Sequence, residues 1–202
     1  IHHLVCTDGS KGSWDPDVDT AQLVARRQNE QRAAAYILGG RDEVTFLGWP
    51  DGELEAGPPQ RRQVAEAIRR IRPQVVLGHD PWKRYRLHPD HRNAGFLLTD
   101  AVVAAREPRV YPDMGLDAHR PRSVLLWEAD EPDHVEAVEA FLDRKIDALM
   151  AHRSQLRSTM GIGDQADVTA QAAFEEHVRT RAAEAGGLAG VICGEAFKAI
   201  TP

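Results

Sequence analysis

The chain has 202 residues, of which 42% are hydrophobic and 28% are charged, and its formal net charge is −6 at pH 7. This length and apolar content are enough for one sizeable core, so we expect a single domain over residues 1–202. The negative charge argues against a general nucleic-acid binder. No apolar run approaches the roughly 20 residues that cross a bilayer, and no secretory signal is visible. We therefore expect a cytoplasmic protein in which Cys6 and Cys193 stay reduced.

Strands alternate with helices along the chain, which favours an α/β sandwich with a mostly parallel sheet. Gly39-Gly40 is typical of a helix end, and Pro58-Pro59 is typical of a helix start. In chain order, we predict a strand at 1–6, a helix at 17–37, a strand at 43–48, a helix at 58–71, a strand at 74–79, a helix at 90–106, a strand at 122–128, helices at 138–157 and 168–185, and a strand at 190–199.

Two further stretches have a distinctive composition. The segment 107–120 contains Pro108, Pro112 and Gly115, so we predict a turn-rich, mobile flap there. Arginines gather between the second predicted helix and the strand that follows it. We interpret this group as the solvated face of a helix: Arg61, Arg62, Arg69, Arg70 and Arg72.

The segment from Asp80 to His91 gathers two imidazoles and a carboxylate at the point where a buried strand ends. In open α/β sheets, ligands bind beyond the carboxyl ends of the strands. Neutral imidazole is the commonest metal ligand, and a nearby carboxylate can fix its tautomer. The alternative is a solvated loop in which Asp90 caps the following helix. The position after a buried strand favours the chemical interpretation.

Asp80-Pro81, followed by the run from His88 to Arg92, resembles the second signature of the PIG-L (LmbE-like) zinc-dependent N-deacetylase family. Other stretches are similar to that family in the same order. They are Cys6-Thr-Asp-Gly9, Arg27-Gln-Asn-Glu30, Phe46-Leu-Gly-Trp-Pro-Asp-Gly52, Ala151-His-Arg-Ser-Gln155 and the closing Gly194-Glu-Ala-Phe197. The resemblance implies a Rossmann-like three-layer sandwich, a Zn²⁺ cofactor, and hydrolysis of an amide in an N-acetylglucosamine-type small molecule. Substrate identity does not carry over within the family.

The family's first signature, an H-P-D-D run after the first strand, is absent from the 202 residues. In the family, that run supplies two of three protein zinc ligands and the general base. We therefore expect the domain to be N-terminally incomplete, with the first strand and helix missing. The strands at 1–6 and 74–79 should then not pair directly, because the missing strand would lie between them. We also expect poor zinc affinity, because one ligand does not make a site.

The resemblance assigns a role to each residue of the H-P-D-H run. His91 would be the metal ligand, although a helix-start histidine bonded to backbone is the alternative. His88 would stabilise the oxyanion of the tetrahedral intermediate as an imidazolium, an effect of roughly 3–4 kcal/mol. Asp90 would accept a hydrogen bond from His88 and stabilise its charged form, or cap the helix, or do both.

The remaining matches imply substrate binding. Arg27 would reach a polar substrate group, with a surface charge paired to Asp19 or Glu30 as the alternative. Asp51 and Asp8 would accept from substrate, although both also suit turns. Tyr85 lines the pocket and donates to the oxyanion, or packs the loop.

Other histidines have less claim to the site. We interpret His152 as a satisfied structural histidine, and we expect His79 and Asp80 to shape the loop. At most one of His2 and His3 can face the site, because successive strand residues alternate in direction.

Two functional classes follow. The first is a zinc amidase that removes an acetyl or related acyl group. The second is a non-catalytic module that keeps the sugar pocket after losing the metal signature. No phosphate-binding glycine motif follows a predicted strand, which weakens a nucleotide-binding interpretation.

Overall fold

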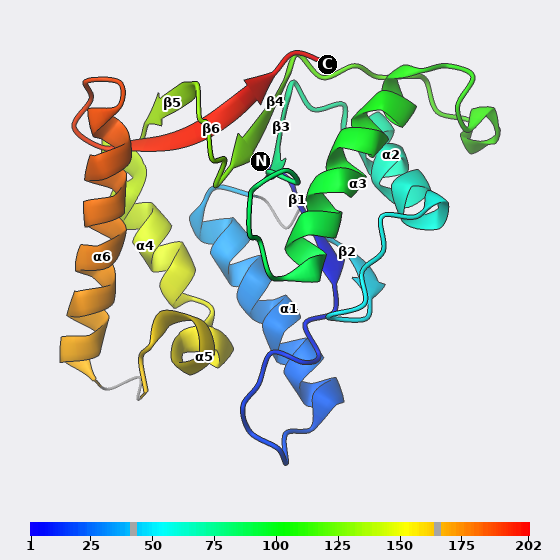
Figure 1. The fold of residues 1–202 in the computed structure, drawn as a ribbon. Coiled ribbons are helices and arrows are strands. Elements are labelled where there is room, and N and C mark those ends of the chain that lie inside the picture. The colour runs from blue at the N-terminus through cyan, green and yellow to red at the C-terminus, as the bar shows by residue number, and fades with distance from the viewer. Residues whose placement is uncertain (41–43, 164–166) are drawn as a thin grey trace. The chain divides into compact units, whose positions relative to one another are not determined.

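The computed structural model describes residues 1–40, 44–163 and 167–202 (Figure 1). Strands and helices alternate almost as the sequence predicts. The elements are β1 (His3–Thr7), α1 (Thr20–Ile37), β2 (Val44–Trp49), α2 (Pro58–Ile71), β3 (Val75–His79), α3 (Pro89–Arg106), β4 (Ser123–Trp127), β5 (His134–Ala137), α4 (Leu142–Met150), α5 (Leu156–Met160), α6 (Val168–Gly187) and β6 (Gly194–Ile200). The first residue of the predicted strand at 43–48 lies outside the described residues. No helix within the described ranges is long and apolar enough to cross a membrane.

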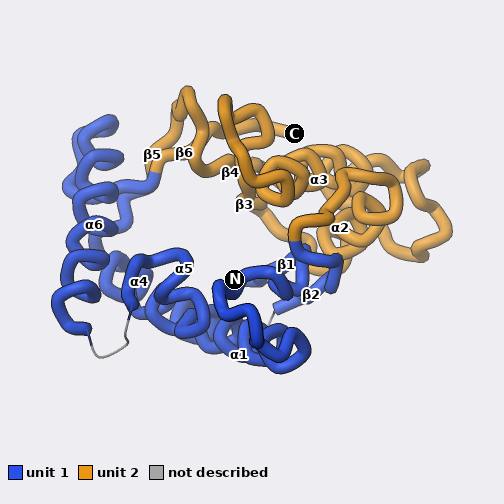
Figure 2. Tube along the Cα trace, turned by 60° about the horizontal axis from the view of Figure 1, so that its bottom comes forward, with its two compact units in different colours: residues 1–51, 136–195 blue, residues 52–135, 196–202 orange. Residues whose placement is uncertain are grey.

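The chain forms two compact units that interleave along the sequence (Figure 2). Unit 1 comprises residues 1–51 and 136–195, and unit 2 comprises residues 52–135 and 196–202. The chain passes from one unit to the other within β5 and again within β6. Our expectation of one domain over 1–202 stays a prediction.

Unit 1 contains the parallel pair β1–β2 and the helices α1, α4, α5 and α6. Asp19 caps α1 by accepting a hydrogen bond from the Gln22 amide, which satisfies one of the free N–H groups of the first turn. A small apolar cluster joins α4 to α6. Its buried members are Leu142, Ile146 and Ala182.

The predicted helix at 138–157 is wrong as a single element. Helix α4 ends at Met150, and a short 3₁₀ turn, Arg153–Gln155, precedes α5. The physical reason is a long-range contact. The Glu30 carboxylate accepts from both the amide and the hydroxyl of Ser154, at 2.9 and 2.6 Å. A continuous helix would instead direct that amide to a carbonyl four residues earlier.

Unit 2 contains a sheet in which β3 pairs parallel with β4, and β4 pairs antiparallel with β6. The sheet order is β3-β4-β6-β5. In the described part of the chain, β1 and β3 belong to different sheets, as expected. The short strand β5 was not predicted, because four residues with one β-branched side chain carry little strand signal.

Helix α3 lies close to β3 at two glycines, and at Gly95 the nearest atoms are backbone. A Cβ atom at Gly78 would lie 2.3 Å from Leu98 Cδ2. A Cβ atom at Gly95 would lie 2.6 Å from the His79 carbonyl oxygen and 2.9 Å from the Pro81 nitrogen. The start of α3 is therefore held directly against the loop that leaves β3.

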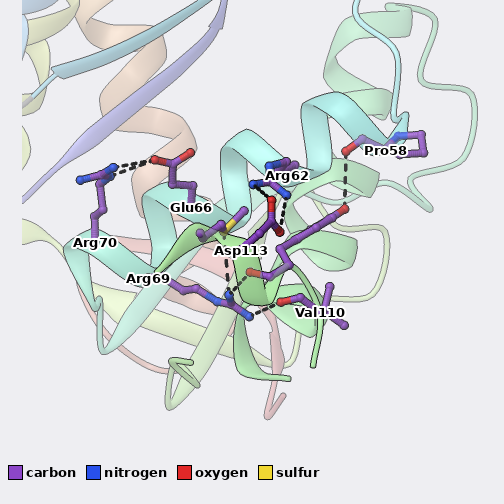
Figure 3. A network of polar contacts seen from close by, with 9 residues as sticks. Pro58, Arg62, Glu66, Arg69, Arg70, Val110 and Asp113 are labelled. Carbon is purple, nitrogen blue, oxygen red and sulfur yellow. Dashed lines mark hydrogen bonds and ion pairs between the residues drawn. The ribbon is translucent and has the colours of Figure 1, made fainter. Parts of the chain in front are cut away.

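The arginines of α2 bind the segment that follows α3 (Figure 3). The Arg69 side chain donates to the carbonyls of Ala104, Ala105, Glu107, Val110 and Tyr111. Arg69 is 3% exposed, so interpreting all five arginines as a solvated face is wrong for this residue.

A second arginine of α2 also reaches that segment. Arg62 forms a two-pronged pair with Asp113, at 3.0 and 2.8 Å. The segment predicted as a flap is therefore tied to α2 at several points.

Candidate functional site

Three histidine rings stack where β3 ends and α3 begins. The His79 and His91 ring centroids lie 4.4 Å apart at an angle of 13°. The His88 and His91 centroids lie 4.5 Å apart at 19°. Local geometry explains the stack, because His79 is the last residue of β3, while His88 and His91 are the N-cap and third residue of α3. The sequence spacing thus correctly placed His88 beside His91.

The loop between β3 and α3 begins with a compact turn. The Asp80 amide donates to the Trp127 carbonyl at 3.2 Å, which extends the β3–β4 pairing by one bond. The Asp80 carboxylate accepts from the Trp82 amide at 2.9 Å. Asp80 therefore shapes the loop, as expected.

His79 is fixed by donors at a single ring nitrogen. Trp127 Nε1 and Arg86 Nη1 lie 2.8 and 2.9 Å from His79 Nδ1. Both groups only donate, so Nδ1 carries no proton and a neutral ring has its proton on Nε2. Burial, with the charges of His91 and Arg86, lowers the pKa of His79 to about 4, against the opposing effect of Glu128. His79 is therefore neutral near pH 7.

His91 is the middle ring of the stack. Although His91 is an exposed residue, partial burial of its ring desolvates the charged form, and this is the main cause of a lowered pKa. The charges of His88 and Arg86 lower the pKa further, while Glu128 and Asp90 oppose them. Neutral imidazole is the form that binds metal.

Asp90 has a different set of contacts from the one expected. Its side chain is buried, and its two oxygens accept from the amides of Gly52 and Leu54, at 2.6 and 3.2 Å. It is neither hydrogen-bonded to His88 nor the cap of α3, whose N-cap is His88. A buried carboxylate needs such donors, and two amides of another loop supply them. Asp90 thus anchors the start of α3 and acts on His91 through its charge.

Tyr85 lies in the loop that leads to His88. It is 88% exposed, and its backbone has a positive φ of 59°. That conformation is uncommon for a residue with a Cβ atom, so the loop holds Tyr85 under some strain. Ring packing around Tyr85 is therefore not what holds this loop.

Unit 1 brings Asp8 and Asp51 together. Asp8 Oδ1 accepts from the amides of Ser10 and Asp51, at 2.9 and 3.1 Å. Burial alone would raise the pKa of Asp8, but these hydrogen bonds and the charge of Lys11 hold it below its usual value. The Lys11 amide in turn donates to Asp51 Oδ2 at 3.2 Å. Asp8 is therefore ionised near pH 7.

Arg27 packs against the loop that follows β1. Its Nη1 donates to the Gly9 carbonyl at 2.5 Å, in place of the ion pairs with Asp19 or Glu30 that we considered. A Cβ atom at Gly12 would lie 2.0 Å from the same nitrogen, so a larger residue there would displace the Arg27 guanidinium. Arg27 and Asp8 both line a cavity of about 120 Å³ within unit 1.

Two histidines have surroundings that the sequence did not predict. His79 was expected only to shape the loop, yet its ring forms one end of the stack, against His91. His152 was expected to be satisfied, but its Nδ1 is buried with no hydrogen-bond partner in the described part of the chain, and the residue lines the cavity beside Arg27. The A-H-R-S-Q stretch was the available signal for His152.

Residues 1–102 match the family model of GlcNAc-PI de-N-acetylase, PIG-L. The chain belongs to the PIG-L family. The resemblance inferred from the ordered motifs is thus confirmed.

Several proteins similar to this chain are named as deacetylases, while a Pseudomonas putida protein that is 28% identical over 70% of this chain and 55% of its own length is named "4-oxalmesaconate hydratase". Diacetylchitobiose deacetylase of Thermococcus kodakarensis is 35% identical over 77% of this chain and 59% of its own length. A Bacillus anthracis protein named "Probable N-acetyl-alpha-D-glucosaminyl L-malate deacetylase 2" is 30% identical over 69% of this chain and 60% of its own length. The chain thus spans about 60% of the length of these curated relatives.

A solved structure confirms the fold class. N,N'-diacetylchitobiose deacetylase from Pyrococcus horikoshii superposes with a TM-score of 0.84 and 28% identity, over 98% of this chain and 72% of that chain. The α/β fold with a mostly parallel sheet and packed helices is therefore as predicted.

His91 is the one candidate zinc ligand that our motif analysis places in this PIG-L chain. As a neutral imidazole at a helix start, it suits that role. Among the described residues, no three His, Cys, Asp or Glu side chains gather as a metal site. A catalytic zinc ion takes three protein ligands. Zinc binding by His91 therefore stays a prediction.

Proposed function

We propose that the chain is part of a zinc-dependent hydrolase that removes an acetyl or related acyl group from an N-acetylglucosamine-type amide. The observation that carries the proposal is the histidine stack, in which His91 is held neutral beside an exposed His88. The named activities of the relatives support the same class of reaction.

Each residue has a distinct part in this proposal. His91 contributes one ligand to zinc, which when bound polarises an amide carbonyl and activates water. His88 donates a hydrogen bond to the carbonyl oxygen as negative charge develops on it. Asp90 serves as a positioning residue, since its two backbone contacts fix the helix start that carries both rings.

We propose that the substrate-binding residues are Arg27, Asp8, Asp51 and Tyr85. Arg27 has donors beyond the one used by Gly9, and ionised Asp8 has a second oxygen beyond the one used by amides. Such groups suit the hydroxyls of an N-acetylated amino sugar conjugate. The Tyr85 hydroxyl would donate a hydrogen bond to the oxyanion when substrate is bound beside this loop.

The test is metal analysis combined with acetate-release kinetics on the full-length protein. His91→Ala should lose zinc and activity together, because it removes a ligand. His88→Ala should retain zinc and lower kcat by roughly 10²–10³, as for one oxyanion donor. His177→Ala, at an exposed position of α6, is the matched control and should change neither.

Two outcomes would contradict the proposal. Zinc lost in His88→Ala and kept in His91→Ala would reverse the two assignments. Wild-type protein that binds diacetylchitobiose but releases no acetate, with zinc supplied, would favour the non-catalytic binding module.

A further inference from the structure

The cavity in unit 1 is built from segments far apart in the sequence. It has a volume of about 120 Å³, and its lining includes the end of β1, the middle of α1 and the turn before α5. Residues from that last segment, His152 and Gln155, have no role in the proposed function. If the proposed function holds, this cavity lies where it can accept one group of the substrate.

His152 is held at the cavity wall by its neighbours. Its amide donates to the Leu149 carbonyl at 3.1 Å, and the Glu30 carboxylate clamps Ser154 two residues later. The ring nitrogen Nδ1 is nevertheless buried and has no hydrogen-bond partner among the described residues. A buried polar atom without a partner is costly, and few remain in native proteins. A ligand hydroxyl in the cavity would provide the missing partner.

The two charged side chains that line the cavity have opposite signs. Arg27 contributes a positive charge and ionised Asp8 a negative one. Burial, with the nearby charge of Arg27, lowers the pKa of His152, against the opposing effect of Glu30, so the ring is neutral at pH 7. The carboxamides of Gln28 and Gln155 add donors and acceptors but no charge. An anion would be attracted by Arg27 and repelled by Asp8 at the same place.

We propose that His152 is a specificity-determining residue of a subsite for a neutral, polyhydroxylated group of the substrate. A hydroxyl both donates and accepts, so a pair of hydroxyls can bind Arg27, Asp8 and His152 Nδ1 at once. The volume equals that of about four water molecules, at about 30 Å³ each. The cavity therefore accepts one hydroxylated edge of a sugar or polyol. A carboxylate, as in the malate part of the substrate named for the Bacillus anthracis relative, would fit its charge poorly.

The first arm of the test measures binding without turnover. Metal-stripped full-length protein labelled at histidine is titrated with N,N'-diacetylchitobiose, and the His152 ring is followed by NMR. We expect the His152 signals to move saturably with this sugar and to stay in place with L-malate. No movement with the sugar, or equal movement with L-malate, would overturn the proposal. This arm does not depend on acetate release, so it stands even if the proposed hydrolase activity fails.

The second arm compares variants. His152→Leu should raise KM for diacetylchitobiose about tenfold and leave kcat within twofold, because one hydrogen bond to the bound group is lost. His152→Asn places a polar nitrogen or oxygen near the former Nδ1 and should recover most of the loss. His177→Leu is the matched surface control.

The variant arm has its own refuting results. An unchanged KM in a folded His152→Leu protein would overturn the assignment. So would a higher kcat/KM of the wild type for the malate conjugate than for diacetylchitobiose. Thermal melts establish that each variant is folded before its kinetics are compared.

Discussion

Replacing Arg69 by Met should destabilise unit 2, because this one side chain satisfies the end of α3. The last carbonyls of a helix have no partner within the helix. Arg69 donates to two of them, Ala104 and Ala105, and both residues are buried. Its charge also lies at the negative end of the helix dipole. Methionine has similar length but no donor.

The loss of stability depends on which carbonyls water can reach once the Arg69 donors are gone. The carbonyls of Glu107, Val110 and Tyr111 lie in a surface segment, so water can satisfy them. Each of the two buried carbonyls costs about 1–3 kcal/mol when unsatisfied, but Ala105 keeps a second donor, the His119 amide. Relief of the buried charge offsets part of the loss. We therefore expect the free energy of unfolding to fall by about 1–3 kcal/mol, chiefly from the Ala104 carbonyl.

The neighbouring residue gives a matched control. Arg70 is exposed and pairs with Glu66 one helical turn away, so Arg70→Met should change stability by less than about 0.5 kcal/mol. Urea unfolding followed by far-UV circular dichroism measures both variants. An Arg69→Met protein that is no less stable than the Arg70→Met protein would refute the helix-end reasoning.

Two further predictions concern close packing and pH. Gly95→Ala should lower the free energy of unfolding by about 1–3 kcal/mol, because its Cβ atom would meet the backbone of His79 and of the loop that follows it. Gly187→Ala, with open space around it, is the control and should be neutral or slightly stabilising. Equal melting temperatures of the two variants would contradict this. The lowered pKa of His152 means that the unfolded chain takes up a proton first as pH falls below 6.5, so its contribution to stability is complete above that pH and is lost below it. Unfolding free energies from pH 8 to pH 5 should therefore fall more steeply in the wild type than in His152→Asn, and parallel curves would disprove the effect.

Local signals in the sequence predicted most of the elements. Paired prolines predicted the start of α2 at Pro58, and the predicted range 58–71 matches the observed helix. The spacing of His88 and His91 predicted two rings on one helix start, because neighbours three residues apart share a face. These features depend on contacts within one or two turns.

The errors arise from contacts between distant residues. Helix 138–157 is interrupted because Ser154 bonds to Glu30, 124 residues earlier in the chain. Asp90 was assigned to a neighbour, but its partners lie 36 and 38 residues away. Arg69 has the composition of a solvated helix face and is buried only because carbonyls after α3 converge on it. Periodicity carries no information on such pairings.

The interleaving of the two units affects how the chain folds during synthesis. Strand β4 pairs with β6, and about 70 residues separate Trp127 from its partner Phe197. At about 5–20 residues per second, β4 waits roughly 4–14 s after its own synthesis before that edge can pair. During this interval the apolar run from Val124 to Leu126, buried in the folded protein, lacks one of its neighbours. A ribosome-bound chain is thus exposed to strand-edge association until its last strand emerges, a demand on chaperones that the finished fold does not reveal.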